Sequence, residues 1–160
     1  MRIGDCIMHN SNENGIVNEL NNFLEGIYMG EDIVNSYREK VKDTFAKGKL
    51  DHILKSYERH EIYVKNLIKD FGSFPTHSVG IEGQILELFN NVKNLLIKGD
   101  KDLIKHCIKS ISIGKENALR FIEEQKDYID NRTLDIMNAI VSEYSHHISH
   151  LKEAVNILEA

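Results

Sequence analysis

The sequence predicts an all-α fold, an antiparallel four-helix bundle with one shorter crossover helix between its second and third long helices. Apolar residues recur at steps of three and four along four long segments, which is the spacing of one face of an α-helix. The chain of 160 residues contains a single proline, and proline would interrupt long helices. No segment of useful length alternates apolar and polar residues as a half-buried strand does. A chain of this length can bury one sizeable core.

The first long helix is expected from about residue 16 to residue 46. Before it, residues 1–14 are rich in Asn and show no periodicity. We therefore expect a flexible leader, followed by a single bundle domain of residues 15–160. Glu31 takes one position of the apolar stripe of this helix. A carboxylate that faces a helical core needs a metal ion, a cation or a hydrogen-bond network, so Glu31 is the first candidate functional residue.

The second long helix is expected from about residue 50 to residue 71, after a turn at Gly48. Glycine suits the left-handed residue that follows a helix. In this second helix, Glu61 again interrupts the apolar stripe. The next segment carries the proline and breaks the pattern, and an amphipathic helix of about residues 81–98 then forms the crossover. Gly99 ends that helix.

The third and fourth long helices are expected at about residues 101–127 and 131–158. Lys115 lies on the core stripe of the third helix, at the position that corresponds to Glu31 in the first. The core of the bundle is therefore expected to contain charged groups of both signs.

A faint internal repeat links the first and third helices. The segment Gly30–Tyr37 resembles the segment Gly114–Phe121. Each has a glycine, an acid two positions later, a branched or small apolar residue at the fifth position and an aromatic residue at the eighth. The first two helices and the last two are therefore expected to form similar hairpins, which is how a ferritin-like bundle is built.

The fourth helix carries the strongest metal-like signal in the chain. A di-iron centre in a helical bundle takes one Glu from each of two helices and a Glu-x-x-His motif from each of the other two. Glu143 and His146 form such a motif, and His147 and His150 share a helical face with Glu143. Because His146 projects away from the apolar centre of the helix, His147 is the inward histidine. The candidate metal ligands are Glu31, Glu61, Glu143, His147 and His150.

The rest of this pattern is incomplete, which favours a core salt-bridge network over a metal centre. The second helix has no histidine three positions after Glu58 or Glu61, and the third has the cation Lys115 in place of a carboxylate. Arg38, one heptad after Glu31, joins the expected interior polar set. Because acids and cations nearly balance in this set, we expect the ion pairs Glu31–Lys115 and Arg38–Glu61. No catalytic residue and no resident cofactor are expected, and iron is the cofactor that the metal alternative would need.

The composition of the chain limits which partners the protein can bind and where in the cell we expect it. The net charge of −5 provides no basic face for nucleic acid. Cys6 and Cys107 are far apart and outside any paired motif, so we expect reduced thiols. No apolar run is long enough for a signal peptide or a bilayer-spanning helix. We therefore expect a cytoplasmic protein that binds neither nucleic acid nor membrane.

Five short segments carry a family resemblance: Gly30-Glu31-Asp32, residues 71–75, residues 94–100, Gly114-Lys115-Glu116 and residues 144–151. Through them the chain resembles, over about residues 16–155, an uncharacterised bacterial ferritin-like family that is known only as a domain of unknown function. The resemblance implies a ferritin-like bundle, related to ferritins and rubrerythrins, with no established activity. The family pattern has Gly-Glu-Asp in the third helix, so Lys115 replaces a potential metal ligand by a cation.

Three functions remain open at this stage. The leading one is a non-catalytic binding or stress-related module, because the ligand set is incomplete. The second is a di-iron or other di-metal carboxylate protein that handles iron, oxygen or peroxide. The third is a dimeric interaction scaffold, in which the amphipathic helix at residues 81–98 forms the face of a homodimer. Substrate and biological process cannot be read from these residues.

Overall fold

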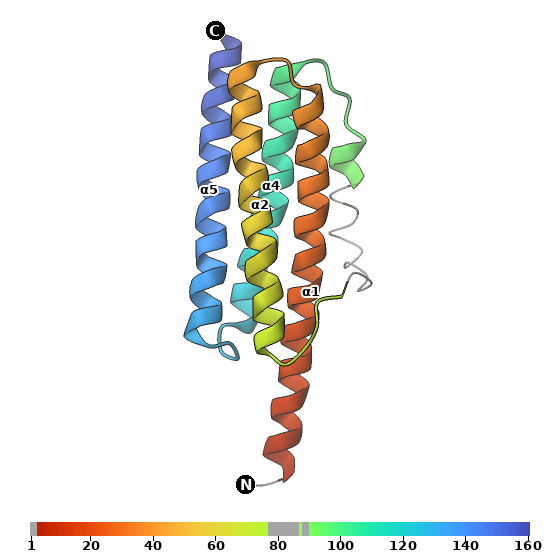
Figure 1. The fold of residues 1–160 in the computed structure, drawn as a ribbon, viewed down its shortest axis with the longest axis vertical. Coiled ribbons are helices and arrows are strands. Elements are labelled where there is room, and N and C mark those ends of the chain that lie inside the picture. Colours follow the sequence, from red (N-terminus) through yellow and green to blue (C-terminus); the bar gives the residue numbers. More distant parts are fainter. Residues whose placement is uncertain (1–2, 77–86, 88–89) are drawn as a thin grey trace.

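Four long helices form an antiparallel bundle in the computed structural model, which describes residues 3–76, 87 and 90–160 (Figure 1). The helices are α1 (Ile3–Lys40), α2 (Thr44–Asp70), α4 (Asp100–Gln125) and α5 (Asn131–Glu159). α1 and α5 each pack against both α2 and α4, so the order around the bundle is α1, α2, α5, α4. The ferritin-like four-helix fold predicted from the sequence is confirmed.

The turn between α1 and α2 lies earlier in the chain than predicted. α1 ends at Lys40 and α2 begins at Thr44, so Gly48 lies inside α2 and not in a turn. The carboxylate of Asp43 caps α2 by accepting a hydrogen bond from the backbone N–H of Ala46 at 2.7 Å. An aspartate N-cap satisfies one of the free N–H groups that begin a helix, so this turn needs no glycine.

Asp100, at the start of α4, completes that turn from a distant part of the chain. Its carboxylate accepts hydrogen bonds from the backbone N–H of Lys42 at 3.0 Å and of Asp43 at 2.7 Å. The end of the α1–α2 hairpin is thereby fixed to the start of the second hairpin (Figure 1).

Two sequence expectations concern the ends of these hairpins. The helical backbone of α1 begins at Ile3 and extends past the end of the neighbouring helices (Figure 1), so it includes most of the segment expected as a leader. The domain boundary at residue 15 stays a prediction. Of the expected crossover helix, residues 81–98, the structure describes residues 87 and 90–98, and residues 87 and 90–93 among these are helical.

The two hairpins have matching patterns of buried residues. Every buried residue of α5 has a buried residue of α2 87 positions before it, as Tyr144 has Tyr57 and His147 has His60. An offset of 84 positions relates every buried residue of α4 except Leu103 to a buried residue of α1, as Gly114 corresponds to Gly30. The bundle therefore has approximate two-fold symmetry, which supports the repeat seen in the sequence. In the described part of the chain, no helix is long and apolar enough to cross a lipid bilayer.

Candidate functional site

Two buried tyrosines meet at the centre of the bundle, one from each hairpin. The ring centroids of Tyr57 and Tyr144 are 5.8 Å apart, and both side chains are almost fully buried. A Cβ atom at Gly30 would lie 2.7 Å from the hydroxyl oxygen of Tyr57, and one at Gly114 would lie 3.3 Å from Cζ of Tyr144. The repeated glycines therefore leave room for the tyrosines of the adjacent helices.

The phenols of Tyr57 and Tyr144 and the thiol of Cys107 are not expected to ionise or react at neutral pH. Burial, followed by the proximity of Tyr144, raises the pKa of Tyr57 well above its ordinary value. Burial also raises the pKa of Tyr144 and of Cys107. All three groups stay protonated at neutral pH, so Cys107 is not a reactive thiolate.

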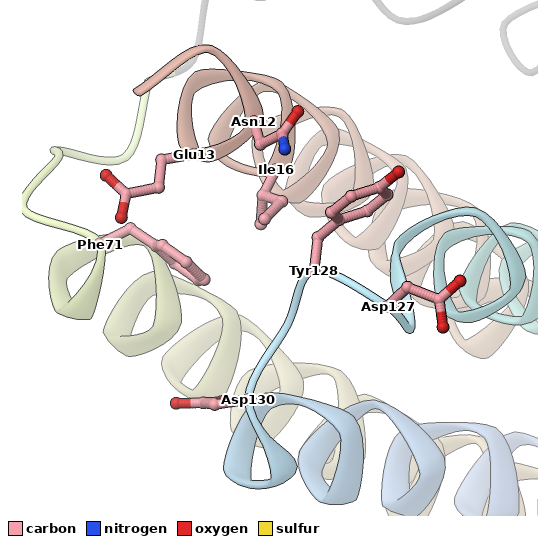
Figure 2. A pocket seen from close by; sticks show the side chains of 7 residues that line it. All are labelled: Asn12, Glu13, Ile16, Phe71, Asp127, Tyr128 and Asp130. Carbon is pink, nitrogen blue, oxygen red and sulfur yellow. The ribbon is translucent and has the colours of Figure 1, made fainter. Parts of the chain in front are cut away.

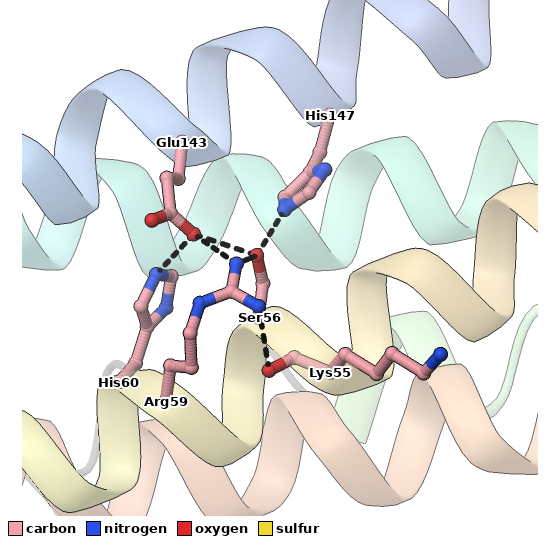
Figure 3. A network of polar contacts seen from close by, with 6 residues as sticks. All are labelled: Lys55, Ser56, Arg59, His60, Glu143 and His147. Carbon is pink, nitrogen blue, oxygen red and sulfur yellow. Dashed lines mark hydrogen bonds and ion pairs between the residues drawn. The ribbon is translucent and has the colours of Figure 1, made fainter.

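A hydrogen-bonded cluster lies beside the tyrosines, between α2 and α5, and we call it the α2–α5 network (Figure 3). It consists of Ser56, Arg59, His60, Glu143 and His147. Oε2 of Glu143 is 2.6 Å from Oγ of Ser56, 3.1 Å from Nη2 of Arg59 and 3.0 Å from Nε2 of His60. Oγ of Ser56 in turn is 2.8 Å from Nη2 of Arg59 and 2.9 Å from Nε2 of His147. One carboxylate and one hydroxyl thus join all five residues.

The contacts determine where the protons lie in this network. The hydroxyl of Ser56 donates its single proton to Glu143, so Nε2–H of His147 must donate to Oγ of Ser56. His60 likewise donates through Nε2–H to the carboxylate of Glu143. Both imidazoles therefore carry a proton on Nε2.

Burial has opposite consequences for the histidines and for the acid. Burial, with the nearby His52 and His60, lowers the pKa of His147 to about 4. Burial also lowers the pKa of His60, although Glu143 opposes that shift. For Glu143 burial alone would raise the pKa, but contacts with Ser56, His60 and Arg59 outweigh it and hold the pKa below its usual value. The network is thus most stable with an ionised acid and neutral histidines.

The network follows the two-fold symmetry of the bundle with one exception. The contact from His60 to Glu143 corresponds to the contact from His147 to Ser56, because 87 positions separate each pair of equivalent residues. Ser56 therefore occupies the place in the first hairpin that Glu143 has in the second.

The other expected ion pairs have different partners. Arg38 does not pair with Glu61, because its Nε atom is 2.7 Å from Oδ1 of Asp51. Glu61 instead pairs with Lys65 and accepts a hydrogen bond from Tyr28 at 3.3 Å. The predicted Arg38–Glu61 pair was wrong.

Glu31 also lacks the cation that the sequence suggested. In the described residues no ion pair joins it to Lys115, which is partly exposed on α4. Burial and the neighbouring carboxylates of Glu61, Glu58 and Asp32 raise the pKa of Glu31. The predicted Glu31–Lys115 pair was therefore wrong as well.

Of the five candidate ligands, only Glu143 and His147 belong to one hydrogen-bonded group. His150 is exposed and lines a surface hollow of about 450 Å³ together with His52. Glu31 and Glu61 lie on the α1–α2 side of the bundle. Within the described residues, no group of three or more His, Cys, Asp or Glu is placed to hold a metal ion.

Sequence reasoning missed Ser56, Arg59 and His60. His60 and Glu61 follow Tyr57 by three and four positions, and both spacings continue a helical stripe. The choice of Glu61 as the inward residue was therefore one position off. The pairing of Tyr57–His60 with Tyr144–His147 in the repeat would have identified His60.

A second hollow of about 540 Å³ lies at the opposite end of the bundle, where Phe71 and Tyr128 approach Ile16 of α1 (Figure 2). The carboxylates of Asp127 and Asp130 at its rim point away from each other (Figure 2). Asp130 also caps α5, with Oδ1 accepting from the backbone N–H of Thr133 at 2.7 Å. Asp127 and Asp130 therefore do not form a convergent pair of acids.

Residues 15–124 match the family described as "Domain of unknown function (DUF2383)". The chain belongs to this family. A search of the curated proteins finds no match to the DUF2383 chain.

Solved structures show the same fold at low sequence identity. A protein from Bacillus anthracis, described among "ferritin like, diiron-carboxylate proteins", is 13% identical with a TM-score of 0.71, over 90% of the DUF2383 chain and 97% of that protein. A conserved hypothetical protein from Mycobacterium tuberculosis is 11% identical with a TM-score of 0.62, over 90% and 97%. A two-domain protein from Anabaena variabilis with DJ-1/ThiJ/PfpI-like and ferritin-like domains is 18% identical with a TM-score of 0.72. The match covers 92% of the DUF2383 chain and 37% of that larger protein.

Proposed function

We propose that this DUF2383 chain is a non-catalytic ferritin-like bundle, a binding or stress-related module, and that it is not an iron–oxygen enzyme. The observation that carries the proposal is the contact of the Arg59 guanidinium with the Glu143 carboxylate at 3.1 Å. That contact gives Glu143 a half-exposed cation of the protein itself as its partner in place of a metal ion.

The donors present do not fit a di-iron centre. Such a centre takes carboxylates from both halves of a bundle. Here two pairs of equivalent positions hold a single carboxylate each: Glu31 corresponds to Lys115, and Glu143 corresponds to Ser56. Glu61 is already paired with Lys65. Glu143 and Glu61 thus already have cationic partners, and Glu31 has no acid at the equivalent position of the second hairpin.

The α2–α5 network also has a structural explanation. Buried polar groups stabilise a fold only when they have hydrogen-bond partners. Glu143 accepts from Ser56, Arg59 and His60 at once, and these contacts fix α2 against α5. A polar network of this kind can specify how two helices align without having a catalytic role.

Metal content tests the proposal directly. The untagged protein would be purified without chelators under anaerobic conditions, supplied with ferrous iron, desalted and analysed by mass spectrometry. We expect far less than one iron ion per chain. About two ions per chain, the number in a di-iron carboxylate site, would refute the proposal.

A di-metal carboxylate protein is the alternative, supported by two observations. The similar Bacillus anthracis protein is described as a diiron-carboxylate protein. In this chain, Glu31 lies near the carboxylates of Glu58 and Glu61, which help to raise its pKa after burial. If this alternative holds, Glu31→Ala must reduce bound iron, whereas our proposal predicts equally low iron in both proteins.

A homodimeric scaffold is a further candidate, supported by an apolar hollow of about 420 Å³ between residues 91–95 and α4. Val92, Leu95, Ile108 and Ile113 supply its apolar wall, and the adjacent Leu96 is 76% exposed. Sedimentation velocity would test this candidate: the wild type should be a dimer and Leu95→Asp a folded monomer. Equal masses for the two proteins would argue against a dimer through this face.

A further inference from the structure

We propose that Glu143, His60 and His147 form a latent site for one divalent metal ion of borderline character, such as Zn²⁺ or Co²⁺, which Arg59 keeps closed. This inference rests on the proposed function, because it explains how the centre of the bundle does without a metal ion.

The donor atoms are of the right kind and partly at the right spacing. Imidazole nitrogen and carboxylate oxygen are common ligands of Zn²⁺, at about 2.0–2.2 Å from the metal in a tetrahedral site. Two such ligands are then about 3.4 Å apart. Nε2 of His60 and Oε2 of Glu143 are 3.0 Å apart, close to this spacing.

The third donor is separated from the carboxylate by a single hydroxyl group. Oγ of Ser56 is 2.6 Å from Oε2 of Glu143 and 2.9 Å from Nε2 of His147. A metal ion bound to both histidines and the acid would displace these two hydrogen bonds. Ser56 would then be free to act as a neighbouring oxygen donor.

The proton on His60 can move to Nδ1 without displacing a partner there, while the hydrogen bond from Nε2 to Glu143 is replaced by the bond from Nε2 to the metal ion. Metal binding through Nε2 requires that the proton shift to Nδ1. Among the described residues, no hydrogen-bond partner occupies the buried Nδ1 atom of His60. The ring stands edge-on to Tyr144, with centroids 5.1 Å apart, so its position is fixed while the proton moves.

Arg59 opposes metal binding through its position and its charge. Its Nη2 atom contacts both Glu143 and Ser56, the two groups that would have to turn toward a metal ion. A guanidinium is permanently charged, and a dication within a few ångströms of it would be strongly repelled. Because the Arg59 side chain is 43% exposed, removing it would also open a path from solvent to the carboxylate.

Binding of Co²⁺ to Arg59→Ala is the decisive experiment, since tetrahedral Co²⁺ has intense visible absorption and aqueous Co²⁺ does not. We expect Arg59→Ala to bind one Co²⁺ per chain with that absorption, at least about tenfold more tightly than the wild type. Adding Glu143→Gln, which keeps the shape of the side chain, should abolish the absorption. Zn²⁺ should displace the Co²⁺.

Two matched variants distinguish the effect of the Arg59 charge on metal binding from the effect of its size and from the effect of removing any exposed arginine. Arg59→Lys keeps the charge and should stay closed to Co²⁺. Arg38→Ala removes a similarly exposed arginine that pairs with Asp51 outside the network, and it should behave as the wild type does. Helical circular dichroism would establish that every variant is folded.

The inference is overturned if folded Arg59→Ala binds no Co²⁺, or if the wild type binds it equally well through Glu143. Such failure leaves the proposed function untouched, because that is tested by iron in the wild type alone. Iron in the wild type would in turn refute the proposed function whatever Arg59→Ala does.

Discussion

The two hairpins of this bundle share their packing residues and differ in their charged ones. Gly30 and Tyr57 in the first correspond to Gly114 and Tyr144 in the second, and in each hairpin the glycine faces the tyrosine, more closely in the first than in the second. At the charged positions, by contrast, Glu31 corresponds to Lys115 and Ser56 to Glu143.

The comparison shows which positions the fold requires. A side chain at either glycine would press against the tyrosine it faces, so the packing favours glycine in both hairpins. A half-buried charge can be replaced where a neighbour or solvent compensates, so those positions have diverged. The following four predictions test this distinction, from the largest expected effect to the smallest.

Glu143→Ala should have the largest effect, a loss of about 3 kcal/mol in the free energy of unfolding. The substitution leaves the buried donor of His60 and the hydroxyl of Ser56 without their acceptor. Urea denaturation would measure it, with Asp51→Ala as the control. That control removes an exposed pair with Arg38 and should cost below about 1 kcal/mol. Similar losses for both variants would show that the network is no more than a surface ion pair.

Acid should weaken the fold through His147, whose pKa is lowered by burial to about 4. In the unfolded chain a histidine has a pKa of about 6.5, so the unfolded state binds more protons between these values. Stability is therefore fully present above about pH 6.5 and falls as the pH drops to about 4, by on the order of 2 kcal/mol.

Unfolding in urea at several pH values would measure this decline. His147→Gln, which can still donate to Ser56, should flatten it between pH 6.5 and 4. The exposed neighbour His146 provides the matched control, because His146→Gln should leave the decline as in the wild type. An unchanged slope in His147→Gln would assign the acid sensitivity to another group.

Gly30→Ala should destabilise the protein by about 1–2 kcal/mol, since the new methyl group would lie 2.7 Å from the Tyr57 hydroxyl, which must shift. Gly114→Ala should change stability by less than about 0.5 kcal/mol, because its 3.3 Å contact is milder and alanine favours the helix. Thermal unfolding of the two variants compares the same contact in both hairpins. Equal effects would mean that the hairpins are packed alike.

Lys115→Ala should have the smallest effect, below about 0.5 kcal/mol. Had Lys115 formed the buried ion pair first expected with Glu31, its removal would cost about 3–5 kcal/mol. A loss of that size in a melt at pH 7 would contradict the partly exposed position of Lys115.

The sequence was sufficient for the fold because apolar periodicity depends only on neighbours in the chain. His147 was predicted as an interior polar residue and Glu143 as a candidate metal ligand, and both belong to the network. His60 was missed because one position along a helix rotates a side chain by about 100°, which separates it from Glu61. Ion-pair partners such as Asp51 for Arg38 depend on how two helices align, and periodicity carries no information about that alignment.

The first turn of the bundle was misplaced for a similar reason. The apolar stripe continues through Val41, which is buried, so the periodicity does not mark the end of α1. The local signal is Asp43, the N-cap of α2, which was overlooked. The residue that completes the turn, Asp100, is 58 positions away from Lys42.

That distant acceptor has a consequence for folding. The amides of Lys42 and Asp43 gain their partner only when the start of α4 has docked against the first hairpin. Neither half of the repeat is then a complete folding unit, and the two should form together in one cooperative step. Protection of the Lys42 amide from hydrogen exchange should therefore report when the second half of the chain docks, although Lys42 itself lies in the first half.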